Sequence, residues 1–347
     1  MRIALTADPY IPVPPRQYGG IERIVYFLAE HLIARGHRVT LFAHPDSNVP
    51  GALLVPYGAP PHVGTVARVR ELAELGGALW SRRRDFDLIH SFGRLAALLP
   101  VLPYRRLPKI QSYQRPVPWR GVLRAVRLAG PSVQFTACSA SLFQAHDRKA
   151  GVGRWTAVFN GVDVTKFQST SEVPPDAPLI YLGKIERMKG VDVAIEIARR
   201  AGRRLIIAGN TVEAGPDRQY FDEEIAPAID GDRVRYTGPV DDVQKNELLG
   251  RAAALLFPTF YDEAFGIVMA EAMACGTPVI AFPRGAVPEV VRPGVNGFVC
   301  RTVDEGVSVV GRLSSIDRRA VRRDCEARFD ARVIVSQYEA IYGRALA

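Results

Sequence analysis

The sequence is poor in the residues that build disulfide frameworks and metal sites. It has four cysteines among 347 residues, and none of them forms a Cys-x-x-Cys pair. The histidines show no metal-ligand spacing either. We therefore expect buried, reduced thiols, no disulfide framework and no bound metal.

Long apolar runs are also missing. No segment approaches the ~18–20 apolar residues that a membrane-spanning helix needs. Residues 1–7 carry an apolar stretch that is short for a secretory signal and typical of a first strand. We therefore expect a cytoplasmic protein.

Lysine is scarce although the chain is basic. Only six of the 45 Lys and Arg residues are lysines, and the formal net charge is +9. Such a charge fits a solvated arginine-rich surface, and it also fits a surface that attracts nucleic acid, an anionic membrane face or phosphorylated ligands. We expect no nucleic-acid partner, and we keep peripheral membrane contact at the inner face open.

What the chain does have is a repeated alternation of short apolar strands and amphipathic helices. In the helix that begins near residue 21, Ile21, Ile24, Val25 and Leu28 line one face. The strands predicted in the first half are residues 3–7, 38–43, 87–91, 109–112, 133–138 and 156–159. Alternation of this kind is typical of a parallel sheet covered by helices on both faces.

The alternation stops at a polar, proline-rich linker, residues 169–178, and then restarts. The elements predicted after it are strands 179–182, 204–208, 234–236, 254–257 and 279–282, and helices 191–201, 219–229, 242–251 and 266–275. We predict two Rossmann-like, doubly wound α/β domains, residues 1–170 and 176–330, that face each other across a cleft. Ligands of such sheets bind beyond the carboxyl ends of the strands.

Residues 258–278 carry the strongest chemical signal. A strand leads through a loop to Gly266, where a helix begins whose free N–H groups can bind an anion. That helix is apolar on all sides except at Glu271, so the carboxylate needs hydrogen-bond donors. A ribose diol would supply them, and a structural arginine or solvent contact is the alternative. Glu263 precedes the helix at the expected mouth of the cleft, or it is a surface carboxylate favoured by the helix dipole.

Three cations follow the first strand of the second half. Lys184, Arg187 and Lys189 lie between Gly183 and Gly190. They could hold a diphosphate, for which lysine supplies point charges, or they could form an ordinary basic loop.

In the first half, Gly19-Gly20 within Gln17–Ile21 opens a helix and would let the backbone approach an anion. No Gly-x-Gly-x-x-Gly follows the first strand, which argues against a dinucleotide oxidoreductase. The Asp-x-Asp sequences at 85–87 and 230–232 precede strands, so we interpret them as solvated loops rather than metal sites.

Four ordered motifs together resemble family 4 of the retaining GT-B glycosyltransferases over nearly the whole chain. Residues 263–271 resemble its E-x7-E motif, and 271–278 its Glu-Ala-Met-Ala-x-Gly-Thr-Pro continuation. Residues 160–163 resemble its Asn-Gly-Val-Asp segment, and 284–291 its Gly-Gly-x-Pro-Glu-x-Val stretch. The opening loop is similar to that of small-molecule and antibiotic-tailoring members.

The resemblance implies a GT-B fold, a nucleotide-sugar donor and no metal cofactor. It implies that Glu271 binds the donor ribose, that Glu263 lies beside the donor sugar, and that Lys184 and Lys189 neutralise the departing diphosphate. The residues that complete the implied donor site are Gly20, Gly183, Arg187, Pro239, Val240, Phe265, Gly266, Ile267 and Val268. The terminal helix, residues 331–347, would cross back onto the first domain.

Two positions depart from the family pattern. Lys184 stands where the family usually has arginine, so the charge survives but the bidentate geometry does not. Tyr113 occupies the place of a frequent histidine, which indicates an unusual acceptor pocket near Gly19, Tyr113 and Gln114.

The predicted activity is transfer of a hexose, with retention, from a UDP- or GDP-linked donor to a hydroxyl of a small-molecule or lipid acceptor. A sugar-nucleotide epimerase or hydrolase of the same architecture is one alternative, and a non-catalytic nucleotide-binding module is another.

Overall fold

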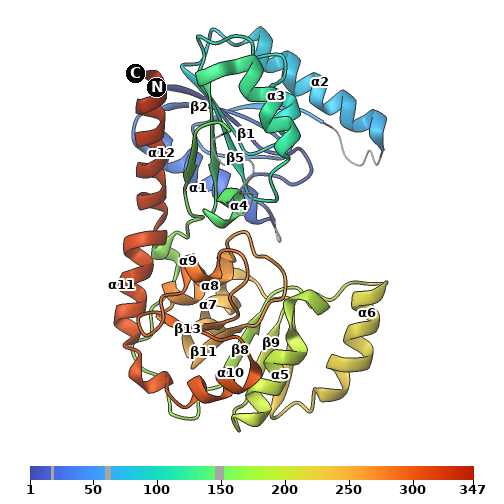
Figure 1. Ribbon diagram of the computed structural model, residues 1–347, viewed down its shortest axis with the longest axis vertical. Helices are drawn as coiled ribbons and strands as arrows, with labels where there is room; N and C mark the ends of the chain where they lie inside the picture. Colours follow the sequence, from blue (N-terminus) through green and yellow to red (C-terminus); the bar gives the residue numbers. More distant parts are fainter. Residues whose placement is uncertain (17–18, 59–63, 145–151) are drawn as a thin grey trace. The chain divides into compact units, whose positions relative to one another are not determined.

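The computed structural model describes residues 1–16, 19–58, 64–144 and 152–347 and divides the chain into two compact units. The first unit consists of Met1–Asn160 and Ala331–Ala347, and the second of Gly161–Asp330. Each unit is built on a parallel sheet with helices packed against it (Figure 1). The predicted α/β class, with two doubly wound domains, is confirmed.

The first sheet has seven strands in the order β3-β2-β1-β4-β5-β6-β7, all parallel. The strands are β1 (Arg2–Thr6), β2 (Arg38–Ala43), β3 (Leu53–Pro56), β4 (Leu88–Ser91), β5 (Lys109–Tyr113), β6 (Val133–Ala137) and β7 (Trp155–Ala157). All residues of β4 and β5 are buried, because both faces of a parallel sheet are covered. The short edge strand β3 was not predicted.

The helices of the first unit include the one predicted near residue 21. In α1 (Gly20–Ala34), Ile24, Val25 and Leu28 are buried, as the apolar spacing requires. The others are α2 (Thr65–Ser81), α3 (Trp119–Ala129), α4 (Ser141–Gln144) and the terminal α12 (Ala331–Leu346).

Helix α12 belongs to the first unit, where it is attached through a buried polar network. Hydrogen bonds join His90 Nδ1 to Tyr342 Oη at 2.6 Å and His90 Nε2 to Ser112 Oγ at 2.7 Å. At the surface, Glu339 accepts hydrogen bonds from Arg35 and His37. The last residues of the chain therefore complete a unit that the first residues begin.

The second sheet has six parallel strands in the order β10-β9-β8-β11-β12-β13. The strands are β8 (Leu179–Leu182), β9 (Leu205–Ala208), β10 (Val234–Gly238), β11 (Ala254–Phe257), β12 (Val279–Ala281) and β13 (Gly297–Val299). Chain order runs outward from β8 to β10 and then outward again from β11 to β13. This reversal makes the β8/β11 boundary the switch point of the sheet, where ligands bind in such folds.

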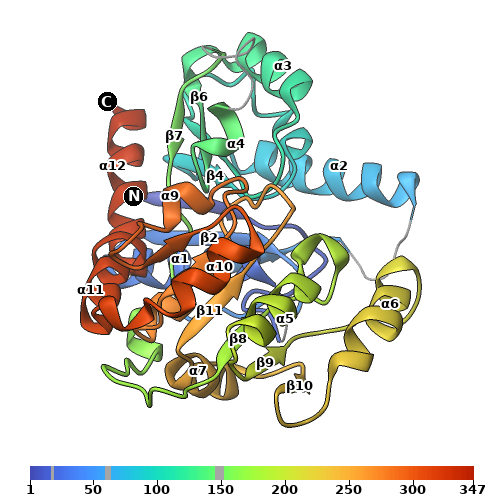
Figure 2. The ribbon, with the colours of Figure 1, turned by 60° about the horizontal axis from the view of Figure 1, so that its bottom comes forward.

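Seven α-helices surround this sheet among the described residues: α5 (Val191–Arg200), α6 (Pro216–Tyr220), α7 (Asp242–Arg251), α8 (Ile267–Ala274), α9 (Val287–Val290), α10 (Val303–Val310) and α11 (Arg318–Phe329). Helices α5 and α10 lie side by side (Figure 2), while α8 packs against α7 and α11. None of the helices in the described ranges combines the length and the hydropathy needed to span a membrane.

The continuous helix predicted over residues 219–229 is wrong. The segment instead consists of α6, a π-helical turn at Phe221–Ile225 and a 3-10 turn at Ala226–Ala228. Pro227 lacks the N–H that would continue the hydrogen-bond ladder, so a regular helix cannot run through it.

The boundary between the units falls at Asn160/Gly161, earlier than the expected end of the first domain at residue 170 and start of the second at 176. The intervening segment packs on the second unit. Arg322 donates hydrogen bonds to the carbonyl oxygens of Val164 (2.9 Å) and Phe167 (3.1 Å), and Thr170 N–H donates to Cys275 O (3.0 Å). A composition change marks the linker, but these long-range contacts decide which unit holds it.

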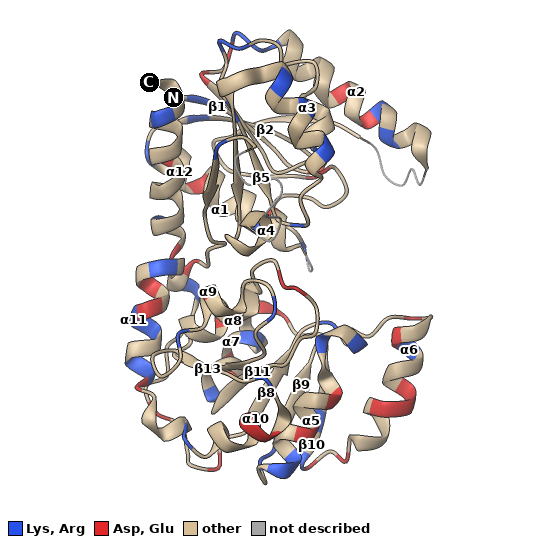
Figure 3. Ribbon diagram, viewed as in Figure 1, with Lys and Arg blue, Asp and Glu red and all other residues tan. Residues whose placement is uncertain are grey.

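Part of the positive charge is structural. Figure 3 shows basic residues along α11, and one of them, Arg318, is buried. Its guanidinium donates to the carbonyl oxygens of Thr170 (2.8 Å), Gly250 (2.9 Å) and Ala252 (2.8 Å) and to the hydroxyl of Thr277 (2.7 Å). Burial lowers the pKa of Arg318 to about 10. This cation therefore satisfies backbone carbonyl oxygens at the end of α7, and its role is structural.

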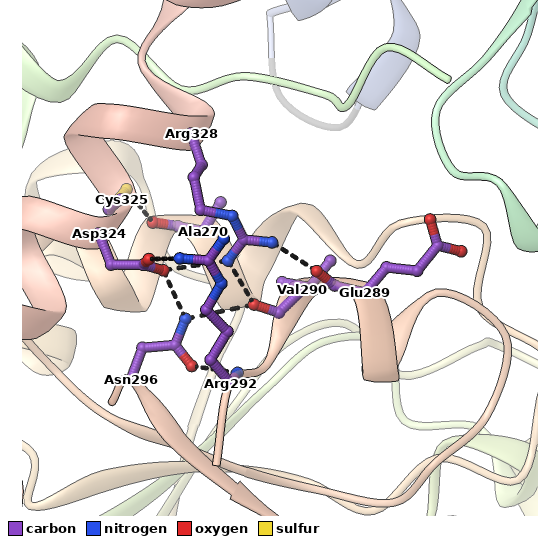
Figure 4. Close-up of polar contacts among 8 residues, drawn as sticks. All are labelled: Ala270, Glu289, Val290, Arg292, Asn296, Asp324, Cys325 and Arg328. Atoms are coloured by element: carbon purple, nitrogen blue, oxygen red, sulfur yellow. Dashed lines mark hydrogen bonds and ion pairs between the residues drawn. The ribbon is translucent and has the colours of Figure 1, made fainter. Parts of the chain in front are cut away.

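A second α11 network holds the segment that follows β12 (Figure 4). Asp324 accepts hydrogen bonds from Arg292 (2.7 Å), Asn296 (2.7 Å) and Arg328 (3.0 Å). Arg328 and Asn296 also donate to Val290 O, at 3.0 and 3.2 Å. The loop between β12 and β13 is therefore anchored to α11 by several hydrogen bonds, of which the one from Asn296 to Asp324 is buried.

The buried His90 predicts a specific acid sensitivity of the first unit. Burial lowers the pKa of His90 to about 3, below the ordinary value of 6.5. His90 therefore binds a proton more readily in the unfolded chain than in the folded one. Its contribution to the free energy of unfolding is complete above pH 6.5 and is lost as the pH falls from 6.5 towards 3. Relative to His90→Gln, the wild type should lose roughly 1 kcal/mol of unfolding free energy per pH unit in that window.

Urea titrations at several pH values, followed by tryptophan fluorescence, measure this effect. All three tryptophans, Trp80, Trp119 and Trp155, belong to the first unit. Parallel pH profiles for the wild type and His90→Gln would contradict the assignment.

Candidate active site

Two loops meet at the switch point of the second sheet. One follows β8 and spans residues 183–190, and the other follows β11 and spans 258–266. Phe260 N–H and Thr259 Oγ1 both donate to Met188 O, at 2.9 and 3.2 Å. The two loops thus form one layer at the carboxyl edge of the sheet.

Gly190 makes the close approach of these loops sterically possible. Its φ is 70°, in the left-handed region, and a Cβ there would lie 2.3 Å from Pro258 O. Any side chain would force the loops apart.

Lys189 and Glu263 form an ion pair between the two loops. Lys189 Nζ lies 2.6 Å from Glu263 Oε2, and the side chains are 23% and 16% exposed. Lys189 Nζ also lies 5.1 Å from the centroid of the Tyr261 ring. Two residues predicted separately as catalytic are therefore in direct contact, although 74 positions separate them in the sequence.

The other two cations of the first loop have different surroundings. Lys184 is half-exposed, with Nζ 3.8 Å from Glu186 Oε1, and Tyr181 Oη donates to its backbone carbonyl at 2.8 Å. Arg187 is in an ion pair with Glu224 and lies over the Tyr220 ring at 4.6 Å. Arg187 is thus tied to the α6 region, whereas Lys189 contacts Glu263. Gly183 begins the loop and donates its N–H to Ala208 O at 3.0 Å.

The amino end of α8 lies directly after Glu263. Gly266 caps the helix with φ 77°, and a Cβ there would lie 2.7 Å from Met269 and 3.3 Å from Glu263 Cγ. Among the described residues, no protein acceptor binds the N–H groups of Gly266, Ile267 and Val268. Phe265 is buried against Phe329, with ring centroids 5.5 Å apart. Free N–H groups at a helix start form an anion site.

Glu271 projects from the same helix and is buried. Its partner is Lys245 of α7, whose Nζ lies 2.5 Å from Glu271 Oε1 and 3.0 Å from Asp242 Oδ1. Burial opposes the charge of Lys245, but Glu271 and Asp242 outweigh it and raise the pKa. Sequence reasoning weighed a structural arginine here and missed the lysine. The capping box formed by Asp241 and Gln244 marks the start of α7, but no local pattern indicates that Lys245 contacts Glu271.

Two residues of the implied donor site, Pro239 and Val240, lie at the edge of the same sheet. Pro239 and Val240 follow β10, the outermost strand, and Gly209 N–H donates to Gly238 O at 2.9 Å. They share the carboxyl edge with the Glu263 loop.

The predicted acceptor residues Gly19, Tyr113 and Gln114, and also Gly20 of the implied donor site, belong to the first unit. Gly19 precedes α1 and Gly20 begins it, while Gln17 and Tyr18 lie outside the described residues. Tyr113 ends β5, is 5% exposed and stacks on Phe135 and Trp155. Burial raises its pKa. Within the described ranges, Tyr113 Oη and both side-chain amide atoms of Gln114 are buried without a hydrogen-bond partner.

Comparison with known proteins identifies the family. A family model described as "Glycosyl transferases group 1" matches residues 164–309, and one described as "Glycosyltransferase Family 4" matches residues 18–166. Together they cover most of the chain. The protein belongs to the GT-B glycosyltransferases of the family 4 type. The GT-B fold and the family 4 type expected from its sequence motifs are confirmed.

The relatives of this glycosyltransferase carry names of different activities. The chain is 26% identical over 398 residues to a glycogen synthase of Mycobacterium tuberculosis, covering 99% of this chain and 94% of the relative. It is 27% identical over 386 residues to a phosphatidyl-myo-inositol mannosyltransferase of Mycobacterium tuberculosis, with coverages of 99% and 96%. The crystal structure of AviGT4, a glycosyltransferase involved in avilamycin A biosynthesis, superposes with a TM-score of 0.71 at 25% identity, with coverages of 99% and 98%.

The Gly190 contact predicts a local defect that a second glycine controls. Gly190→Ala should lower the free energy of unfolding by about 1–3 kcal/mol more than Gly202→Ala, because overpacking is added to backbone strain. Gly202 has nearly the same φ, 66°, and no atom lies within 4 Å of its added Cβ. Urea unfolding followed by circular dichroism compares the two variants, and equal losses would mean that the loops are not in contact.

Proposed function

We propose that this glycosyltransferase moves a hexose, with retention of anomeric configuration, from a UDP- or GDP-linked donor to an acceptor hydroxyl without a metal ion. The observation that carries the proposal is the Lys189–Glu263 pair directly before the free N–H groups of α8. The site thus combines a cation, a helix start that can bind an anion, and Glu271 of the same helix, whose carboxylate can accept hydrogen bonds from a ribose diol.

The donor diphosphate is bound at this helix start. The N–H groups of Gly266, Ile267 and Val268 donate to phosphate oxygens, and Lys184 and Lys189 add positive charge. As the glycosidic C1–O bond lengthens, negative charge accumulates on the diphosphate. Each donor aimed at that charge can lower the barrier by about 3–4 kcal/mol. These cations supply the charge that a metal ion provides in other phosphate-transfer sites.

The transfer step exchanges one bond for another at C1 of the sugar. The acceptor oxygen forms a bond to C1 on the face from which the diphosphate leaves, and the hydroxyl proton passes to a diphosphate oxygen. Glu263 lies beside the sugar and, through its ion pair, holds Lys189 in place. Its carboxylate favours positive charge developing at C1, whether it only positions the sugar or bonds to C1 in an intermediate.

The acceptor is held by the first unit, near Gly19, Tyr113 and Gln114. The unpartnered phenol and amide atoms favour a ligand with hydroxyl groups, because buried polar atoms need partners. The name of the phosphatidyl-myo-inositol mannosyltransferase supports a lipid acceptor. The likeness to AviGT4, which is involved in avilamycin A biosynthesis, supports an acceptor from natural-product synthesis. For a lipid acceptor the basic chain would approach an anionic membrane face.

We place the reaction in the cytoplasm. Cys275, Cys300 and Cys325 are buried and form no disulfide, and reduced thiols persist in a reducing compartment.

Nucleotide binding in EDTA tests the donor site. Titrating the protein with UDP, GDP, ADP and TDP by calorimetry should give binding of one of them, because protein cations replace the metal. Glu271→Ala should weaken that binding by roughly 10-fold or more, the cost of a charged hydrogen bond. Binding only after Mg²⁺ is added would overturn the metal-independent site.

Turnover tests Glu263. Glu263→Gln should lower kcat by at least about 100-fold while nucleotide affinity stays within about threefold, because the change removes charge beside the reacting carbon. Glu172→Gln, at an exposed linker carboxylate, is the matched control. Unchanged kcat would remove Glu263 from the mechanism, and NMR of the product decides between retention and inversion. A free hexose in place of a glycoside would indicate a hydrolase.

A further inference from the structure

Lys245 and Glu271 form an ion pair that is largely withdrawn from water. Their side chains are 13% and 10% exposed, and they connect α7 to α8. Exposed ion pairs have little effect on a protein, whereas a buried pair makes each partner depend on the other. Lys245 is therefore an integral part of the Glu271 environment.

The pair occupies only one of the two carboxylate oxygens. Lys245 Nζ donates to Glu271 Oε1, and among the described residues no protein group donates to Oε2. The neighbours of Glu271 on α8, Ala270 and Ala272, are apolar and buried. Glu271 Oε2 is not among the fully buried atoms that lack a partner, so it is accessible to a donor from a ligand or from water.

Lys245 contacts a second carboxylate besides Glu271. Its Nζ is shared with Asp242, an exposed carboxylate of α7, so one cation faces two carboxylates. The aromatic ring of Phe167 lies 5.8 Å from the same Nζ. Lys245 thus holds one oxygen of Glu271 while it also contacts Asp242.

We propose that Lys245 is a positioning residue that makes the site selective for ribonucleotides. It holds Glu271 by one oxygen and leaves Oε2 directed to accept from a ribose hydroxyl of the nucleotide. The inference rests on the proposed donor site and adds to it the residue that sets its sugar selectivity. A donor that lacks the 2′-hydroxyl loses one hydrogen bond to a charged acceptor, which lowers affinity on the order of 10- to 100-fold.

This role differs measurably from a purely structural one. If Lys245 only fastened α7 to α8, removing it would weaken ribo- and deoxyribonucleotides by the same factor. If it positions Glu271, removal weakens the ribonucleotide and leaves the 2′-deoxy analogue nearly unchanged. The ratio of the two dissociation constants therefore separates the roles.

The experiment measures this ratio by calorimetry for UDP and 2′-deoxy-UDP, and for GDP and 2′-deoxy-GDP. For the nucleotide that binds the wild type, the dissociation constant of the 2′-deoxy analogue should exceed that of the ribonucleotide by a factor on the order of 10–100. Lys245→Met should bring the ratio to within about threefold of unity, and Lys245→Arg, which keeps the charge, should restore most of it. Lys166→Met removes an exposed lysine and should leave the ratio unchanged.

Lys245→Leu covers the case in which Lys245→Met does not fold, because it also removes the donor to Oε1. A wild-type ratio near one, or a ratio that persists in Lys245→Met and Lys245→Leu, would overturn the role of Lys245 while nucleotide binding stands. If the wild type bound none of these nucleotides, the proposed function itself would be overturned together with this inference.

Discussion

The contact between the β8 and β11 loops is the constraint on which the candidate site depends. Gly190 allows backbone atoms of one loop to approach Pro258 O of the other, and Met188 O accepts from both Thr259 and Phe260. Only with the loops in this register do Lys189 and Glu263 meet. Their ion pair then lies before the start of α8, whose N–H groups are directed to the same edge of the sheet. Backbone packing thus assembles the charges.

Cations have three distinct uses in the second unit. Arg318 of α11 is buried among carbonyl oxygens and stabilises the end of α7, so it serves the fold. Lys189 pairs with Glu263 at the candidate donor site, where a diphosphate can share it. Lys245 of α7 forms an ion pair with Glu271 of α8. The net charge of the chain distinguishes none of these uses, because each depends on which acceptor the folded backbone brings within reach.

Local patterns predicted much of the fold. The apolar strands from β4 to β12 and the amphipathic α1 follow from periodicities that neighbouring residues express directly. The short edge strands β3 and β13 lack an apolar run long enough to indicate a strand. Pro227 interrupts a helix that the apolar spacing alone predicts. The boundary at Asn160 likewise depends on contacts such as Arg322 with Val164, between residues far apart in the chain.

The sequence by itself determined the class of fold, the family and the residue types of the candidate donor site, because the E-x7-E segment and the lysine loop are continuous in the chain. Only the tertiary structure decided how these residues pair. It joined Lys189 to Glu263, assigned Arg187 to Glu224, and gave Glu271 a lysine partner from α7. The physical reason is that an ion pair acts over a few ångströms in space. Local sequence patterns do not record which distant side chains the folded sheet brings to that distance.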